Sequence, residues 1–157
     1  MRLVMKFLAP LLGWLAFSLF RSSIFKSSRA RHHLVMKLFR VAADNGSTKA
    51  LSVYGHLLHY RGEDESNKIQ GAIYLRRAAE QGDTKAAYQI ARLFEQGYPV
   101  IGEDADKALQ FYCQAGEKGH VLAIKRLIEV YEYGGLHQLA DPQQLAFWKQ
   151  QQSRFCS

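Results

Sequence analysis

The sequence predicts an all-α fold in which antiparallel helical hairpins follow one another along the chain as an α-solenoid. Three stretches of the 157 residues restate one pattern: 41–62, 77–97 and 114–134. Each contains a glycine (Gly46, Gly82 or Gly119), after which an alanine and two larger apolar or aromatic residues follow at intervals of four. Residues four apart share one face of a helix, and a repeat of 36 or 37 residues is typical of stacked helical hairpins.

The first helix of each hairpin is expected to follow the repeated glycine and to end at a second glycine. These closing glycines are Gly62, Gly97 and Gly134. The second helix precedes the next repeated glycine, with small residues three and four positions before it and bulky residues seven and eight before it. A fourth copy begins at Asp141-Pro142, an N-cap residue followed by proline at the first helical position. This copy is expected to bring Phe147-Trp148 to the place of the bulky pair.

The N-terminal residues 1–30 form an apolar segment with a basic flank. The 14 positions from Phe7 to Phe20 carry no charge, which is short of the roughly 20 residues that span a bilayer and fits a signal-peptide core. If Lys6 reaches the interface, residues 3–20 make a marginal span. We expect an uncleaved membrane anchor through residues 3–20. The positive charge that follows it favours an inner-membrane protein whose solenoid is cytoplasmic.

Two alternatives for this segment stay open. It is either a cleaved signal peptide, which would make the protein periplasmic, or an extra helix. Such a helix would pack on the domain or lie at the membrane surface.

The net charge of +7 arises in the N-terminal arm. Residues 1–40 contain eight Lys or Arg and no Asp or Glu, whereas residues 41–157 contain 13 basic and 14 acidic residues. A nucleic-acid-binding domain would carry a basic stripe on its folded part, so we expect no nucleic-acid partner. The two cysteines, Cys113 and Cys156, form neither a disulfide framework nor a metal motif.

A consensus is recognisable around the third repeated glycine. A helix, a glycine, a loop, D-x-x-K-A-x-x-F-Y-x-x-A and E-x-G resemble the Sel-one-like repeat (SLR) family, a relative of the tetratricopeptide repeat. The matching residues are Asp104, Lys107, Ala108, Phe111, Tyr112, Ala115, Glu117 and Gly119. The resemblance covers residues 31–152, about three units, and leaves 153–157 as a C-terminal tail. It implies a right-handed α-solenoid that binds protein partners on a concave face and performs no catalysis.

Two positions depart from this consensus. Gly71 takes the helical position that Ala108 fills in the next unit, at a cost of about 1 kcal/mol. Ile128 stands where the earlier copies have Gly55 and Ala91. Because the third copy lacks this small residue, we expect less regular packing toward the C-terminal end.

The candidate binding residues are the positions six, ten and thirteen after each repeated glycine, because these lie on one side of the first helix. They are Ser52, His56, His59, Tyr88, Arg92, Glu95, Lys125, Glu129 and Glu132. An aromatic ring, an arginine and mixed charges on adjacent helices would suit a polar peptide. The alternative is a solvated face with local pairs such as Lys125 with Glu129.

No motif predicts catalysis, a cofactor or a metal. The chain has no glycine-rich phosphate loop, no serine nucleophile elbow and no paired carboxylates with a matching histidine, and no small-molecule substrate is evident. His56-x-x-His59 lacks the further ligands of a zinc site. We therefore expect a non-enzymatic protein–protein adaptor or scaffold held at a membrane. The alternatives are an exported periplasmic SLR protein and a structural subunit of a membrane complex.

Overall fold

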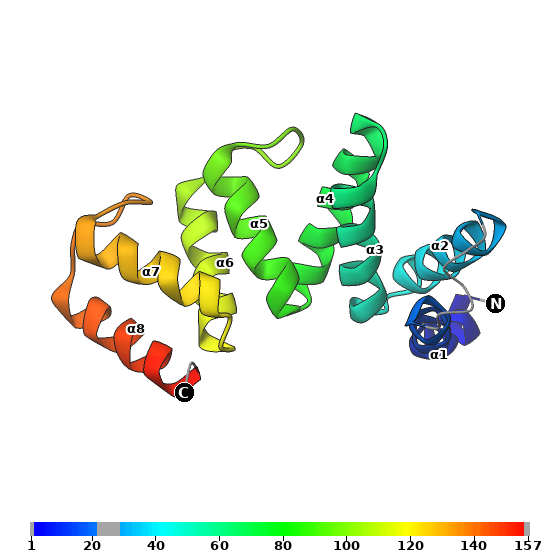
Figure 1. The fold of residues 1–157 in the computed structure, drawn as a ribbon, viewed down its shortest axis with the longest axis horizontal. Helices are drawn as coiled ribbons and strands as arrows, with labels where there is room; N and C mark the ends of the chain where they lie inside the picture. The colour runs from blue at the N-terminus through cyan, green and yellow to red at the C-terminus, as the bar shows by residue number, and fades with distance from the viewer. Residues whose placement is uncertain (1, 22–28, 156–157) are drawn as a thin grey trace. The chain divides into compact units, whose positions relative to one another are not determined.

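The structure, a computed structural model, describes residues 2–21 and 29–155 and is entirely helical over these ranges apart from turns and loops (Figure 1). The helices of the described part are α1 (Arg2–Arg21), α2 (Arg29–Asp44), α3 (Thr48–Arg61), α4 (Glu65–Glu80), α5 (Thr84–Gln96), α6 (Ala105–Glu117), α7 (Val121–Tyr133) and α8 (Pro142–Phe155). Within each unit, helices that follow one another along the chain pack together, α1 to α4 in the first and α5 to α8 in the second, so the predicted all-α hairpin fold is confirmed. The chain divides into two compact units, Met1–Ala78 and Ala79–Ser157.

The three repeated glycines form the turns that lead into α3, α5 and α7. Their φ angles are +93°, +91° and +81°, a left-handed conformation that glycine adopts without a Cβ clash. The residue directly after each glycine caps the next helix, because its side chain accepts a backbone N–H three residues further on. These caps are Ser47, Asp83 and His120. The turn and the cap together fix where each first helix begins.

The predicted helix ends are also found. Helices α3, α5 and α7 each end one residue before their closing glycine. Helix α8 begins at Pro142, and the Asp141 carboxylate accepts the backbone N–H groups of Gln143 and Gln144 at 2.8 and 3.2 Å.

In the first unit, α3 and α4 approach each other closely at two glycines. A Cβ added at Gly71 would collide with the backbone nitrogen of His59 and would lie 2.8 Å from the carbonyl oxygen of Gly55. A Cβ added at Gly55 would lie 2.9 Å from the backbone nitrogen of Leu75. The low helix propensity of Gly71 is therefore the cost of a backbone contact that no other residue permits.

In the second unit, an aromatic side chain from α8 packs into a space left by a glycine in α6. A Cβ added at Gly116 would lie 2.8 Å from Cζ3 of Trp148, whose side chain is 2% exposed. Phe147 is 42% exposed. Trp148-Lys149, rather than the expected Phe147-Trp148, thus matches Phe111-Tyr112. The sequence-based register was wrong by one residue here. The loop before α6 and the loop before α8 have equal length, so α8 begins 37 residues after α6, and Trp148 takes the place of Phe111.

Helix α1 packs on α2 and α3 of the first unit. Ala16 is fully buried, and a Cβ added at Gly13 would lie 3.0 Å from Oγ of Ser47 and 3.7 Å from Cβ of Ala50. The described residues contain no helix that combines the length and the apolar character needed to cross a membrane. Part of the basic flank, residues 22–28, lies outside the described residues.

Helical structure extends past the limits expected for the solenoid. Helix α2 begins at Arg29, two residues before the expected start of the solenoid, and α8 continues to Phe155. Residues 156–157 of the expected tail, including Cys156, lie outside the described part.

Candidate functional site

The three candidate binding residues of α3 are tied to their own unit. Ser52 is buried, with 6% of its surface exposed, so it does not form part of an accessible row. The Nδ1 atom of His56 lies 2.7 Å from the carbonyl oxygen of Ser52, and Nδ1 of His59 lies 3.1 Å from that of Lys68 on α4. Because each imidazole donates to a backbone carbonyl, this pair of histidines has a structural role. The described residues contain no group of three His, Cys, Asp or Glu side chains arranged for a metal ion.

On α5, the ring of Tyr88 forms the centre of an aromatic cluster. It stacks on the imidazole of His120, with centroids 4.3 Å apart and an angle of 21°, and it lies 6.0 Å from the ring of Tyr112. Burial, together with the nearby charge of Lys85, lowers the pKa of His120. A neutral imidazole accepts the N–H of Ala123 at the start of α7. The half-buried Tyr88 thus connects α5 to the N-terminus of α7.

Glu95 is the acceptor of a polar network that joins three helices. Its carboxylate accepts the Tyr112 hydroxyl of α6 at 2.6 Å and the Nε–H of Arg126 on α7 at 3.0 Å. The Nη1 group of Arg126 donates to Glu129 at 2.9 Å. Burial opposes the charge of Arg126, but its hydrogen bonds to Glu95 and Glu129 outweigh this and raise the pKa of the guanidinium. Burial and the bond to Glu95 raise the pKa of Tyr112.

A related contact occurs one hairpin further along the second unit. Lys149 on α8 lies 3.3 Å from Glu132 on α7, at positions 37 residues after Tyr112 and Glu95. The thirteenth position of the row therefore serves to bridge helices in both hairpins. Two of the candidate acidic residues, Glu95 and Glu132, are engaged in holding the fold.

Part of the row remains available on the surface. Arg92 is partly exposed, and Lys125 and Glu129 are exposed. Within the described part of the chain, neither Arg92 nor Lys125 has an ion-pair partner, and the hydroxyl of Tyr88 has no hydrogen-bond partner. The second unit thus presents two cations, one carboxylate and one phenol on α5 and α7, over a network that fixes these helices. We call Tyr88, Arg92, Lys125 and Glu129 the α5–α7 polar face.

Sequence reasoning missed the residues that organise this face. Arg126 and His120 lie outside the row positions, and the sequence indicates Tyr112 only as a residue of the repeat consensus. Comparison between copies could have found Tyr112, because an acidic residue at position thirteen and a polar residue at the matching place of the second helix recur as Glu95 with Tyr112 and Glu132 with Lys149. This comparison does not point to Arg126 or His120.

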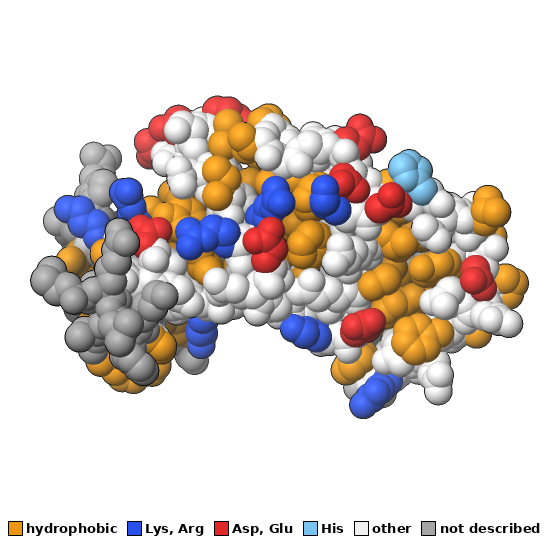
Figure 2. Space-filling view, turned by 180° about the vertical axis from the view of Figure 1, so that it is seen from behind, with side chains coloured by type: hydrophobic (Ala, Val, Ile, Leu, Met, Phe, Trp, Pro, Cys, Tyr) orange, Lys and Arg blue, Asp and Glu red, His pale blue; other side chains and the backbone are white. Residues whose placement is uncertain are grey.

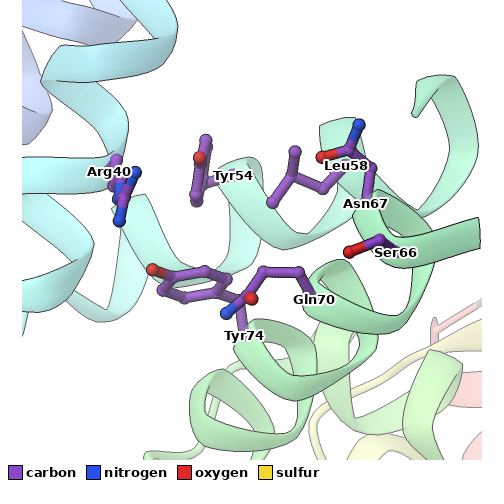
Figure 3. A pocket seen from close by; sticks show the side chains of 7 residues that line it. All are labelled: Arg40, Tyr54, Leu58, Ser66, Asn67, Gln70 and Tyr74. Carbon is purple, nitrogen blue, oxygen red and sulfur yellow. The ribbon is translucent and has the colours of Figure 1, made fainter. Parts of the chain in front are cut away.

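The first unit has a polar pocket of about 180 Å³ between α2, α3 and α4 (Figure 3). It is lined by Arg40, Tyr54, Leu58, Ser66, Asn67, Gln70 and Tyr74. The Tyr74 hydroxyl donates to Asp44 at 2.8 Å, and burial together with this bond raises the pKa of Tyr74 to about 12. Arg40 lies 3.8 Å from the same carboxylate. Arg40 and Tyr74, two residues of the pocket lining, are therefore both engaged by the carboxylate of Asp44.

On the face shown in Figure 2, acidic and basic side chains alternate with apolar ones over both units.

Comparison with known families and structures identifies the repeat. Residues 48–83 and 84–120 each match the family described as Sel1 repeat. Each match starts at the first helix of a hairpin and ends at the turn that leads into the next, so it reproduces the structural unit.

Three proteins are similar to this chain. The chitin synthase regulator SKT5 of Saccharomyces cerevisiae is 32% identical over 75 residues, which cover 45% of this chain and 11% of that protein. The crystal structure of a Sel1 repeat protein from Oxalobacter formigenes superposes with a TM-score of 0.75 at 20% identity, covering 91% of this chain and 57% of that one. The crystal structure of c5321, a protective antigen of uropathogenic Escherichia coli strains with an SLR fold, gives 0.69 at 17% identity, covering 95% and 30%. This chain thus spans less than two thirds of each of these proteins.

Proposed function

We propose that this chain, two hairpins of which match the Sel1 repeat, is a non-catalytic scaffold that binds a protein partner through the α5–α7 polar face. The resemblance implies binding by stacked first helices, and α5 and α7 are the first helices of their hairpins. The name of the yeast relative, chitin synthase regulator, is consistent with a role exerted through protein contact.

The observation that carries the proposal is the network around Glu95. It links α5, α6 and α7 through charge-assisted hydrogen bonds, which are about twice as strong as neutral ones. A fixed surface loses little conformational entropy when a partner binds. The cations that remain on this surface, Arg92 and Lys125, can then pair with charges on the partner, and Glu129 keeps its second carboxylate oxygen, Oε1, as an acceptor beside its bond from Arg126.

The chemistry of the face indicates the type of segment that it would bind. Arg92 and Lys125 offer cationic donors for a carboxylate, and Glu129 offers an acceptor for a basic or amide group. The phenol of Tyr88 adds apolar contact area with a polar end, a combination enriched at interfaces. A polar segment of mixed charge, with at least one acidic residue, fits these groups.

The proposal is tested with the double variant Tyr88→Ala/Arg92→Ala. We expect its affinity for the partner to fall at least tenfold while its helical circular dichroism stays unchanged. Because Tyr88 also stacks on His120, the single variant Arg92→Ala, which leaves this stack in place, should on its own weaken binding measurably. The matched control, Tyr133→Ala/Arg154→Ala, removes the same two side-chain types from exposed positions outside the row and should bind as the wild type does. Normal binding by the first variant, or equal loss in both, would contradict the assignment.

The cellular location is a further part of the proposal. We infer that the scaffold is membrane-associated, with the repeats on the cytoplasmic side of the inner membrane. A membrane-impermeant maleimide should then label Cys156 only after the inner membrane is disrupted, on a chain of full-length mass. Cys113 reacts slowly, because burial raises the pKa of its thiol to about 11.

Labelling of intact cells with a shortened chain would instead indicate a periplasmic protein with a cleaved signal. Loss of the protein when a neighbouring subunit is deleted would favour a structural subunit of a membrane complex.

A further inference from the structure

The outer face of α1 is apolar and has no covering element in the described part of the chain. Leu11, Trp14 and Leu15 are 61%, 66% and 42% exposed. Their spacing of three and four places them on one side of the helix. Figure 2 shows apolar side chains at this N-terminal end of the molecule, at the lower left. Three large exposed side chains on one face form a patch of the kind that marks an interaction site.

The opposite face of α1 is held by the first unit. Ala16 is fully buried, and Gly13 approaches Ser47 so closely that an added Cβ would lie 3.0 Å from its Oγ. Nζ of Lys49 on α3 lies 4.6 Å from the centroid of the Phe17 ring. The helix therefore has one face packed on protein and the other exposed.

We propose that the Leu11–Trp14–Leu15 face docks into the surface of an anionic membrane, with α1 lying parallel to the bilayer. Charge complementarity selects this occupant, because residues 1–40 carry eight Lys or Arg and no acidic residue. Basic segments concentrate at anionic leaflets, and tryptophan is favoured at the boundary between headgroups and acyl chains. This inference rests on the membrane association proposed above and names the surface that makes the contact; it is separate from the α5–α7 polar face and from the binding of a protein partner.

The packing of α1 favours this arrangement over a spanning helix. A helix that crossed the bilayer would have to withdraw Gly13, Ala16 and Phe17 from α2 and α3, whereas an interfacial helix keeps both contacts at once. The uncharged run from Phe7 to Phe20 has 14 residues. At 1.5 Å per residue its length is about 21 Å, against about 30 Å for the hydrocarbon core.

The test uses the full-length chain and lipid vesicles. Sedimentation measures the partition coefficient on phosphatidylcholine vesicles with and without 30% phosphatidylglycerol, at low and high salt. The variant Leu11→Gln/Trp14→Gln/Leu15→Gln alters only exposed side chains. The control Val100→Gln/Tyr133→Gln/Leu139→Gln alters three apolar side chains that are 65%, 78% and 88% exposed in the second unit.

Depth is measured separately by quenching of tryptophan fluorescence with lipids brominated at shallow or deep positions. The chain has two tryptophans, and Trp148 is buried at 2% exposure. The difference between the wild type and Trp14→Phe therefore isolates the signal of Trp14.

We expect binding to anionic vesicles that weakens several-fold in high salt and at least tenfold in the triple α1 variant, with the control unchanged. Trp14 should be quenched most strongly by the shallow bromines. Absent binding, or equal binding by the triple variant, would overturn the proposal. Strongest quenching at the bilayer centre would overturn it in favour of a spanning helix. A concentration-dependent dimer that the triple variant abolishes, without vesicle binding, would assign the face to a second copy of the chain. Because none of these readings involves a protein partner, the scaffold proposal is tested independently.

Discussion

Replacing Gly116 by alanine should destabilise the second unit, although alanine is the better helix former. In an exposed helix this change would stabilise by about 1 kcal/mol. Here the new methyl group would lie 2.8 Å from Cζ3 and 3.2 Å from Cη2 of Trp148, and 3.0 Å from Cδ1 of Leu127. Both neighbours are buried, at 2% and 0% exposure, so neither side chain can swing into solvent.

The size of the effect follows from these opposing contributions. Overpacking a filled core costs about 1–3 kcal/mol, and contacts with two confined side chains place this site in the upper part of that range. After subtraction of the gain in helix propensity, we expect a net loss of about 1–2 kcal/mol. Urea denaturation followed by circular dichroism measures it as a lower midpoint at constant slope.

A second substitution, Trp148→Phe, tests whether contact with the indole ring causes this loss of stability. The positions 37 residues earlier hold Ala79 and Phe111, a larger residue in α4 and a smaller ring in α6. Trp148→Phe removes the atoms that meet the new methyl group, and it also removes an indole N–H that has no hydrogen-bond partner in the described part of the chain.

The double variant Gly116→Ala/Trp148→Phe should therefore be more stable than the sum of the single changes predicts, by at least about 1 kcal/mol. If Gly116→Ala is as stable as the wild type, or if the two effects simply add, the packing argument is refuted.

Four further outcomes are expected. Ala86→Leu should lower the free energy of unfolding by about 1–3 kcal/mol, seen as a lower urea midpoint, because Ala86 is fully buried in α5. Glu95→Gln should cost about 1–3 kcal/mol by weakening two bonds across helices, and a double-mutant cycle with Arg126 should show the coupling. Stability should fall as the pH rises from 10 to 12, because Tyr74 loses its proton near 10 when unfolded but at about 12 when folded; Tyr74→Phe should reduce this fall in alkaline urea titrations, and the remainder should come from Tyr112, whose pKa is also raised in the folded chain. Stability should also decrease below pH 6.5, because the unfolded chain protonates His120 before the folded chain does; His120→Asn, which keeps an N-cap residue, should flatten this limb.

The repeat made most of the fold predictable from the sequence. Glycines close α3, α5 and α7 where they were expected, and Asp141 caps α8. These signals are local, because a turn or a cap depends on residues within a few positions of each other. The burial of Ala86 and Ile90 on the first helix of the second unit likewise follows from a spacing of four.

The rest depended on contacts that spacing does not encode. Gly71 looks like a weak helix residue until the backbone of α3 is placed against it. Glu95 is indistinguishable from a solvent-exposed glutamate until Arg126, 31 residues away, is brought to it. The apolar run of α1 is equally consistent with lipid and with protein contact, and only the packing at Gly13 and Ala16 shows that one of its faces is used by the fold.

The central claim, that the α5–α7 polar face binds a protein partner, is tested most directly by site-specific photocrosslinking in cells. A benzophenone side chain would replace Arg92 in one strain and Arg154, an exposed residue of α8, in another. We expect one discrete crosslinked protein from position 92, none from position 154, and competition of the crosslink by the purified wild-type chain. The same protein crosslinked from both positions, or from position 154 alone, would contradict the account.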